Sequence, residues 1–161
     1  MSLTIGKLRR LQQCSTPDGV FVVVALDHRD DLRRLLKPGE PESLSYGEMA
    51  AFKSEVVQAL APVSSAVLLD PEYGAAQAIA AGALPGNTGL MVTVEAAGYT
   101  GDAGNRRTTL LDEWGVDKIA RMGASAVKMR LYYHPEARHA ARQEALVDEV
   151  EVDLAGLHAP D

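Results

Sequence analysis

The sequence predicts a parallel α/β fold, because strand-like and helix-like stretches alternate four times along its 161 residues. The strand-like stretches are short and mostly apolar, a pattern typical of strands covered on both faces. Parallel strands in one sheet are joined by right-handed crossovers, usually through a helix. Two architectures fit these observations: an open doubly wound sheet, or part of a (β/α)8 barrel.

The opening quarter of the chain predicts the first helix and the first strand. Apolar residues at intervals of three favour a helix over residues 4–13. The segment STPDG, residues 15–19, has the composition of a turn. The continuous apolar run FVVVALD predicts a buried strand over residues 21–27. The stretch HRDDLRRLL that follows is polar and helix-like, and the two prolines of KPGEPES end it.

A capping box marks the start of the next helix. Ser45 is followed three residues later by Glu48, so we expect a helix over residues 45–60 that stops before Pro62. The apolar run SSAVLLD then predicts a second buried strand over residues 64–70.

The second half of the chain continues the same alternation. It predicts helices over residues 73–83, 111–122 and 135–157, and strands over residues 90–95 and 125–133. The last helix has an apolar stripe at intervals of four, four and three residues, formed by Leu146, Val150, Leu154 and Leu157.

Composition limits the classes of partner and compartment. With 22 acidic and 16 basic side chains the net charge is -6, which argues against nucleic acid or an anionic membrane as the main partner. No apolar run approaches the roughly 18 residues of a membrane span, and the start MSLTIGKLRR lacks the apolar segment of a secretory signal. Cys14 is the only cysteine, which excludes an internal disulfide. We therefore expect a cytoplasmic protein whose partners are small molecules.

The chain contains no glycine-rich phosphate cradle. The turn after the first expected strand is DHRDD, without the glycines of a dinucleotide fingerprint, and Gly89 precedes a strand and not a helix. Arg106 and Arg107, in the loop after the third expected strand, are more typical of solvated side chains than of an anion site. A dinucleotide-binding fold is therefore disfavoured.

Charged residues gather at the carboxyl ends of the expected strands. Side chains alternate between the two faces of a strand, and this alternation gives each strand one apolar face and one face that becomes polar near its end. In a (β/α)8 barrel the apolar face lies under the helices and the polar ends meet at the mouth, where active sites are found. The charged side chains predicted to converge there are Asp27, Asp70, Glu95, Lys128 and Arg130.

Several of these residues have a structural alternative. Asp70 precedes PEYG, where a carboxylate can simply cap a helix. Lys128 lies between two apolar residues, so it can form a buried ion pair with Asp27 or Glu95, or serve as a catalytic amine or phosphate-binding cation. His28 points toward the polar face only if the strand ends before it.

Four motifs carry a resemblance to a known family. They are VALDHR (residues 24–29), LLDPEYG (68–74), VEAAGY (94–99) and AVKMRLYY (126–133). In order and register they resemble the class I tagatose-1,6-bisphosphate aldolase family, which includes relatives that cleave sulfofructose phosphate. The resemblance implies a complete (β/α)8 barrel that cleaves a ketose phosphate through a lysine Schiff base to dihydroxyacetone phosphate. It implies no metal or organic cofactor.

The same resemblance assigns roles to individual residues. It implies that Asp27 is an active-site carboxylate, followed by His28 where the family usually has glutamine. Lys128 matches a lysine that assists the reaction without forming the Schiff base. The Schiff-base lysine of the family lies on the sixth strand and its proton-transfer glutamate on the fifth, so both would lie beyond residue 161. Since a barrel needs about 250 residues, residues 1–161 are expected to form about the first four βα units of a single barrel.

Three functional hypotheses follow. In the first, the chain is part of a Schiff-base aldolase, with Asp27 and Lys128 as catalytic residues. A sugar phosphate is then bound by His28, Asp70, Glu95 and Arg130. In the second, a barrel lyase or isomerase binds Mg²⁺ through Asp27, Asp70 and Glu95 to stabilise an enolate. In the third, the chain is a non-catalytic truncated paralogue. In each case the open strand edges of a half-barrel predict a homo-oligomer.

Overall fold

The computed structural model describes residues 3–102 and 105–156 of the chain. Four parallel strands form one sheet, and their spatial order is their chain order. They are β1 (Val23–Leu26), β2 (Ala66–Leu69), β3 (Gly89–Thr93) and β4 (Ala126–Lys128). An open doubly wound sheet would reverse its strand order at a switch point, whereas consecutive neighbours are the order of a barrel. The structure therefore has the topology of the first half of a (β/α)8 barrel.

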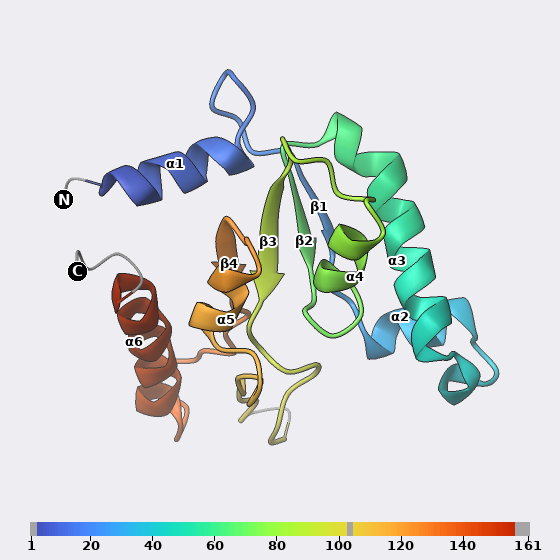
Figure 1. Cartoon of the computed structure of the whole chain (residues 1–161). Helices are drawn as coiled ribbons and strands as arrows, with labels where there is room; N and C mark the ends of the chain where they lie inside the picture. Colours follow the sequence, from blue (N-terminus) through green and yellow to red (C-terminus); the bar gives the residue numbers. More distant parts are fainter. Residues whose placement is uncertain (1–2, 103–104, 157–161) are drawn as a thin grey trace.

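Helices alternate with the strands along the chain, as the pattern predicts, and they lie outside the sheet (Figure 1). The α-helices are α1 (Ile5–Cys14), α2 (Asp30–Leu36), α3 (Tyr46–Leu60), α4 (Ala75–Ala80), α5 (Val116–Arg121) and α6 (Ala140–Gly156). Short 3-10 turns are η1 (Pro41–Ser43) and η2 (Ala61–Val63). α1 lies near the ends from which the strands start, where it contacts β3 and β4. No helix within residues 3–102 and 105–156 has the length and apolarity that a bilayer span requires.

One face of the sheet is packed against helices, and the other is covered only in part. Val67, Leu69 and Val92 point toward the helices and are at most 1% exposed, and they pack with Val57 of α3 and Ile119 of α5. Side-chain alternation predicts this face correctly.

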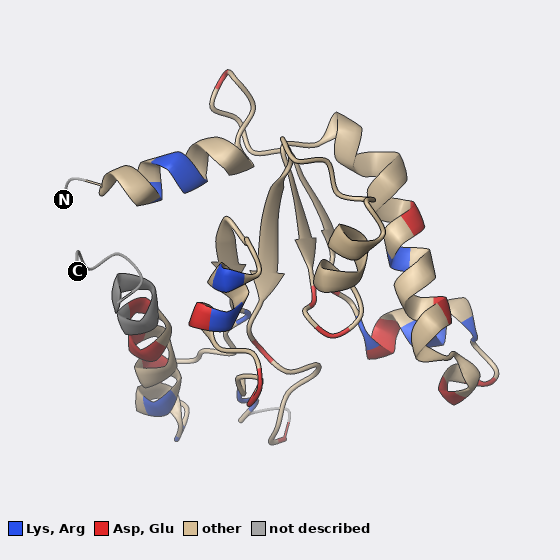
Figure 2. Ribbon diagram, viewed as in Figure 1, with Lys and Arg blue, Asp and Glu red and all other residues tan. Residues whose placement is uncertain are grey.

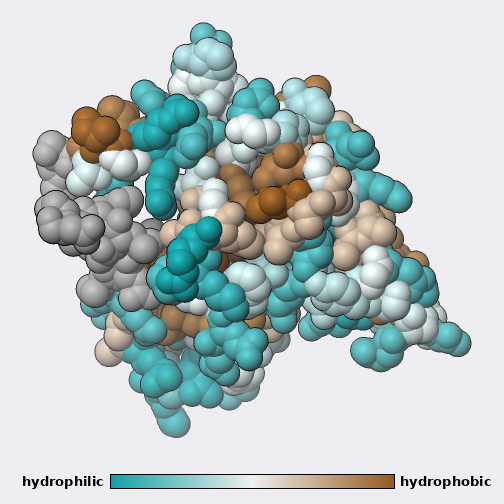
Figure 3. All heavy atoms as spheres, in the orientation of Figure 1, coloured by the Kyte–Doolittle hydropathy of each residue, from teal (hydrophilic) through white to brown (hydrophobic). Residues whose placement is uncertain are grey.

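The opposite face of the sheet is partly uncovered. Val23 of β1 is 39% exposed, and Phe21 just before it is 54% exposed. Apolar side chains also reach the surface at the start of α1, where Ile5 is 81% exposed (Figure 3). In a closed barrel this inner face of the sheet would meet the opposite wall.

The strands end earlier than the apolar runs suggest, and β4 shows why. Residues 125–133 were expected to be extended, but β4 ends at Lys128. The hydroxyl of Thr108 donates to the carbonyl of Arg130 (2.7 Å) and accepts from the amide of Tyr132 (3.1 Å). This loop contact replaces continued pairing with β3 and directs the chain away from the sheet.

Helices α5 and α6 begin several residues later than predicted. Residues before Val116 return to the sheet, because the amide of Leu111 donates to the carbonyl of Val94 (2.8 Å). The last helix begins at Ala140. Of its predicted apolar stripe, Leu146 is half-buried and Val150 is buried, whereas the side chain of Leu154 and residue Leu157 lie outside the described part.

Candidate active site

A lysine held between two carboxylates lies at the carboxyl ends of the strands. The Lys128 ammonium, from β4, donates to Oδ2 of Asp27 (2.8 Å) and to Oε1 of Glu95. Asp27 directly follows β1, and Glu95 lies two residues after β3. The side chain of Glu95 is only 3% exposed, and those of Asp27 and Lys128 are mostly buried. The prediction that Lys128 and Asp27 share one pocket is confirmed.

The site has two carboxyl groups, of Asp27 and Glu95, that share the single ammonium of Lys128. Burial acts to raise the pKa of Asp27, but the hydrogen bond and charge of Lys128 outweigh burial and lower it below its ordinary value. The second oxygen of Glu95, Oε2, is buried and has no hydrogen-bond partner among the described residues. A buried carboxylate oxygen without a donor is costly, so this atom can accept a hydrogen from a ligand hydroxyl.

The three side chains open into a cavity of about 350 Å³. Its wall includes two more residues that the sequence singled out, His28 and Arg130. His28 is exposed, and Arg130 donates to the carbonyl of Gly98 (2.9 Å) while its guanidinium lies over the ring of Tyr132. Charged residues lie at the strand ends or just beyond them, as Figure 2 shows. The site therefore combines carboxylates, an ammonium and a guanidinium at one end of the sheet.

Asp70 does not join this site, although its place at the end of β2 predicts that it should. Its carboxylate is fully buried, forms an ion pair with Lys53, and accepts the amides of Glu72 (3.0 Å) and Tyr73 (2.7 Å). The Asp70 side chain therefore stabilises the turn between β2 and α4. This role is similar to the helix-capping alternative considered for Asp70 from the sequence. β2 ends at Leu69, so the alternation of its side chains no longer applies at Asp70.

The separation of Asp70 bears on the magnesium hypothesis. Asp27 and Glu95 both bind Lys128, whereas Asp70 binds a different lysine, so the three carboxylates do not converge on one point. Within the described ranges no three His, Cys, Asp or Glu side chains are grouped so that they could hold a metal ion.

Lys53, which is fully buried in α3, was not among the site residues predicted from the sequence. Its ammonium donates to the carbonyls of Leu26 (2.9 Å) and His28 (2.7 Å) as well as to Asp70. Burial lowers the pKa of Lys53, and the charge of Asp70 opposes that shift. The sequence does contain a pattern that indicates the burial of Lys53. Lys53 lies four residues from both Met49 and Val57, on the stripe of α3 that faces the core.

Arg29 is a second buried cation that the sequence did not single out. It is 7% exposed, and its guanidinium pairs with Glu72 (2.5 Å) and donates to the backbone carbonyl of Glu95 (2.6 Å). No local periodicity points to this role, because both partners are more than forty residues away in the chain.

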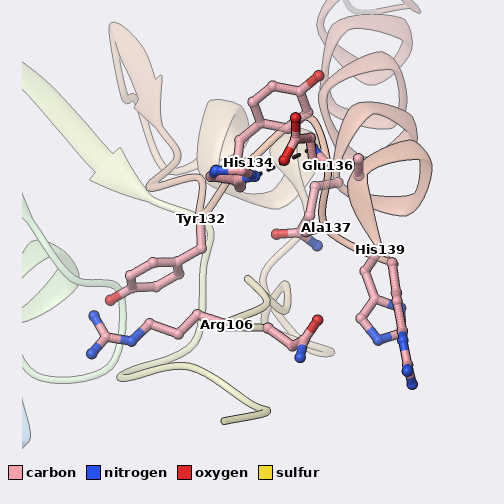
Figure 4. A pocket seen from close by; sticks show the side chains of 11 residues that line it. Arg106, Tyr132, His134, Glu136, Ala137 and His139 are labelled. Atoms are coloured by element: carbon pink, nitrogen blue, oxygen red, sulfur yellow. Dashed lines mark hydrogen bonds between the residues drawn. The ribbon is translucent and has the colours of Figure 1, made fainter. Parts of the chain in front are cut away.

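A second cavity, of about 600 Å³, adjoins the first and shares Tyr132 with it. Figure 4 shows Arg106 extending beneath Tyr132, with His134 and Glu136 on the far side. The Arg106 guanidinium lies 4.5 Å from the ring centre of Tyr99, which packs edge-on against Tyr132. Among the described residues Arg106 has no acidic partner. Arg106 is exposed, as the sequence predicted, and it also lies at the wall of this cavity.

Comparisons with known proteins show what the chain is similar to. The family model described as DeoC/LacD family aldolase matches residues 21–153. Tagatose 1,6-diphosphate aldolase of Streptococcus agalactiae serotype V is 34% identical over 144 residues, which cover 89% of this chain and 43% of that protein. Tagatose 1,6-diphosphate aldolase 2 of Enterococcus faecalis is 35% identical over 143 residues, covering 86% and 42%. A Staphylococcus aureus tagatose 1,6-diphosphate aldolase is 32% identical over 133 residues, covering 83% and 40%.

The chain thus spans about two fifths of the length of these curated relatives. Its four parallel strands, with helices between them, correspond to half of the barrel that this family forms. The match covers the first strand through most of the last helix, including every residue of the Asp27–Lys128–Glu95 cluster. The chain belongs to the DeoC/LacD aldolase family.

Proposed function

We propose that this chain supplies the N-terminal half of the active site of a class I aldolase. The substrate is a phosphorylated ketose such as tagatose 1,6-bisphosphate, which is cleaved to dihydroxyacetone phosphate and an aldehyde. The observation that carries the proposal is the ammonium of Lys128 between Asp27 and Glu95, at the carboxyl ends of parallel strands. The similarity to tagatose 1,6-diphosphate aldolases supports the same substrate class.

The chemistry needs an amine, a proton acceptor and a group that holds the substrate oxygens. In a class I aldolase a lysine amine condenses with the ketone and releases water, and the iminium accepts the electron pair of the breaking carbon–carbon bond. A carboxylate removes the proton from the hydroxyl that becomes the aldehyde. By the family resemblance the condensing lysine lies beyond residue 161.

Within this chain, the proposed roles follow from charge and hydrogen bonding. The ammonium of Lys128 holds an oxygen beside the reacting carbon, because a cation there stabilises developing negative charge. Asp27 orients Lys128 and a substrate hydroxyl. The free Oε2 of Glu95 accepts a second hydroxyl hydrogen.

Two arginines support a phosphorylated substrate. Arg130 lines the site cavity and lies over the ring of Tyr132, and Arg106 lines the neighbouring cavity and lies over the ring of Tyr99. Neither guanidinium is neutralised by a carboxylate of the described residues, and a planar guanidinium suits bidentate phosphate binding. We assign the phosphate groups of the substrate to these two side chains.

A chimera tests the reaction directly. Residues 1–161 replace the aligned N-terminal segment of the Streptococcus agalactiae relative, and release of dihydroxyacetone phosphate from tagatose 1,6-bisphosphate is followed by a coupled assay. We expect turnover, and we expect Lys128→Met in the chimera to lower kcat by about 100-fold or more, as for loss of a charge-stabilising donor. Lys118→Met, on the exposed surface of α5, is the matched control and should leave kcat unchanged.

Other outcomes would point elsewhere. A chimera that folds, as judged by circular dichroism, but shows no turnover contradicts the proposal and favours the non-catalytic hypothesis. Loss of activity in EDTA favours metal-assisted chemistry. Borohydride trapping with dihydroxyacetone phosphate should place the adduct outside residues 1–161, and an adduct on Lys128 would make that residue the nucleophile.

A further inference from the structure

The segment that carries Asp27 is anchored from the helix layer by one buried side chain. Lys53 reaches from α3 to the end of β1, where its ammonium donates to the carbonyls of Leu26 and His28. The residue between those two carbonyls is Asp27. The third donor of the ammonium goes to Asp70, so every hydrogen of the Lys53 ammonium has an acceptor.

We infer that Lys53 is a positioning residue, which fixes the backbone on both sides of Asp27 and thereby holds its carboxylate against Lys128. Asp70 is its counter-ion, and its other oxygen accepts two amides of the turn after β2. The Lys53–Asp70 pair therefore ties the end of β1 to the end of β2 through α3.

The cost of burying this pair supports a positioning role. Both side chains are 0% exposed, and two apolar residues of similar volume often stabilise a core as well as a buried ion pair does. An apolar side chain at position 53 could fill the space but could not donate to the two carbonyls. The hydrogen-bond donors of Lys53 are thus needed for the contacts that anchor Leu26 and His28, and not for packing.

Arg29 anchors the backbone of Glu95, the second carboxylate that binds Lys128, in a similar way. Its guanidinium donates to the backbone carbonyl of Glu95 and is itself held by Glu72. Each carboxylate that binds Lys128 is therefore attached to backbone that a buried cation anchors: Lys53 for Asp27, and Arg29 for Glu95. The catalytic meaning of this arrangement rests on the proposed aldolase function, but the positioning itself can be measured on Lys128.

The test compares two charge-pair removals in the 161-residue chain. Lys53→Met with Asp70→Asn removes the buried pair but keeps an oxygen that accepts the two turn amides. Lys37→Met with Glu48→Gln removes a more exposed pair, between the end of α2 and the first turn of α3 (2.9 Å), and is the matched control. Acetylation of Lys128 by limiting acetic anhydride is measured by mass spectrometry relative to the exposed Lys7 in the same sample.

We expect the buried double variant to raise the relative acetylation of Lys128 by about three- to tenfold, because an amine released from its two charge-assisted hydrogen bonds is reached more readily by the reagent. The surface variant should stay within about twofold of the parent chain by the same reasoning. Urea unfolding of both variants separates a loss of stability from a loss of positioning.

Equal labelling of Lys128 in the two variants would overturn the inference, even if the buried variant is less stable. If the double variant does not fold in buffer, the labelling of both variants is repeated in trimethylamine N-oxide, which favours the compact state. Labelling of Lys128 should then still rise in the buried double variant relative to the surface variant. Equal labelling under these conditions would contradict the role of Lys53. None of these readouts depends on turnover, so they can fail or succeed independently of the proposed function.

Discussion

At the scale of single residues, Lys128 determines the charge state of the pocket. Removing it by Lys128→Met leaves Asp27 and Glu95 as neighbouring carboxylates without their shared cation. Burial and like charge then both favour the neutral acid, so the pKa of Asp27 should rise from its lowered value to above the ordinary range. Carboxyl ¹³C chemical shifts followed over pH measure this directly, with Lys118→Met as the surface control.

The same substitution changes how stability depends on pH. In the parent chain the lowered pKa of Asp27 means that its carboxylate stabilises the fold above the unfolded-state value of 3.8, and that this contribution is lost as pH falls through the folded-state value. In Lys128→Met the sign reverses, and the variant should gain stability as pH falls from 7 toward 4. At pH 7 we expect a loss of about 2 kcal/mol. Urea unfolding of the parent chain and the variant at pH 7 and pH 4 measures this difference. An equal loss of unfolding free energy at both pH values would contradict the expected reversal.

At the scale of elements, the capping box fixes the start of α3, the helix that carries Lys53. The hydroxyl of Ser45 accepts the amide of Glu48 (3.2 Å), and Oε2 of Glu48 accepts the amide of Ser45 (2.8 Å). Ser45→Ala should therefore lower the free energy of unfolding by about 1 kcal/mol. Ser54→Ala, in the middle of the same helix, is the control and should have a much smaller effect in urea unfolding.

Glu48 adds a pH signature to this helix start. Hydrogen bonds from the Ser45 hydroxyl and from Lys37 lower its pKa to about 2. The ionised form thus supports the fold above its ordinary value of 4.5, and that support is lost as pH falls from 4.5 toward 2. Ser45→Ala should flatten the loss of stability in this window. An unchanged pH profile would show that the capping box is not the source.

Gly89 allows β3 to begin directly against the end of α1. A Cβ at this position would lie 2.6 Å from the carbonyl oxygen of Gln13 and 2.9 Å from Cα of Cys14, both of which are backbone atoms. Gly89→Ala should cost about 1–3 kcal/mol, since the helix end must move. Gly86→Ala, in the preceding loop, meets no atom within 4 Å and serves as the control in thermal or urea unfolding. Equal stability of the two variants would refute the close packing.

At the scale of the whole molecule, the inner face of the sheet is uncovered at β1, where Val23 and Phe21 are exposed. Across the described ranges β1 pairs only with β2, and β4 only with β3. Unpaired strand edges and exposed apolar side chains favour association, so we predict that the chain forms symmetric oligomers through this surface.

Sedimentation at micromolar concentration tests this prediction. Val23→Asp places a charge on the open face and should shift the distribution toward monomer. Val63→Asp, at a site in η2 that is 75% exposed, is the matched control and should leave association unchanged. A parent chain that is already monomeric, or two variants that behave alike, would contradict the role of the open face.

Local patterns determined most of the architecture. The β-branched runs, the capping box at Ser45 and the alternation of side chains predicted four parallel strands, the packed face of the sheet and the meeting of Asp27 with Lys128. These features depend on residues near one another in sequence or on the fixed period of a strand, so they can be read without the tertiary structure. The motifs around the same residues also indicated the family.

Tertiary contacts determined the side-chain orientations that local periodicity could not predict. Asp70 follows the last residue of β2, and there a contact with Lys53, seventeen residues away, determines where its carboxylate lies. Thr108 ends β4 by binding the backbone of Arg130 and Tyr132. Arg29 anchors Glu95 across sixty-six residues of chain. Strand period constrains a side chain only while the strand continues, and beyond its end the orientation depends on hydrogen-bond partners that the fold brings from distant segments.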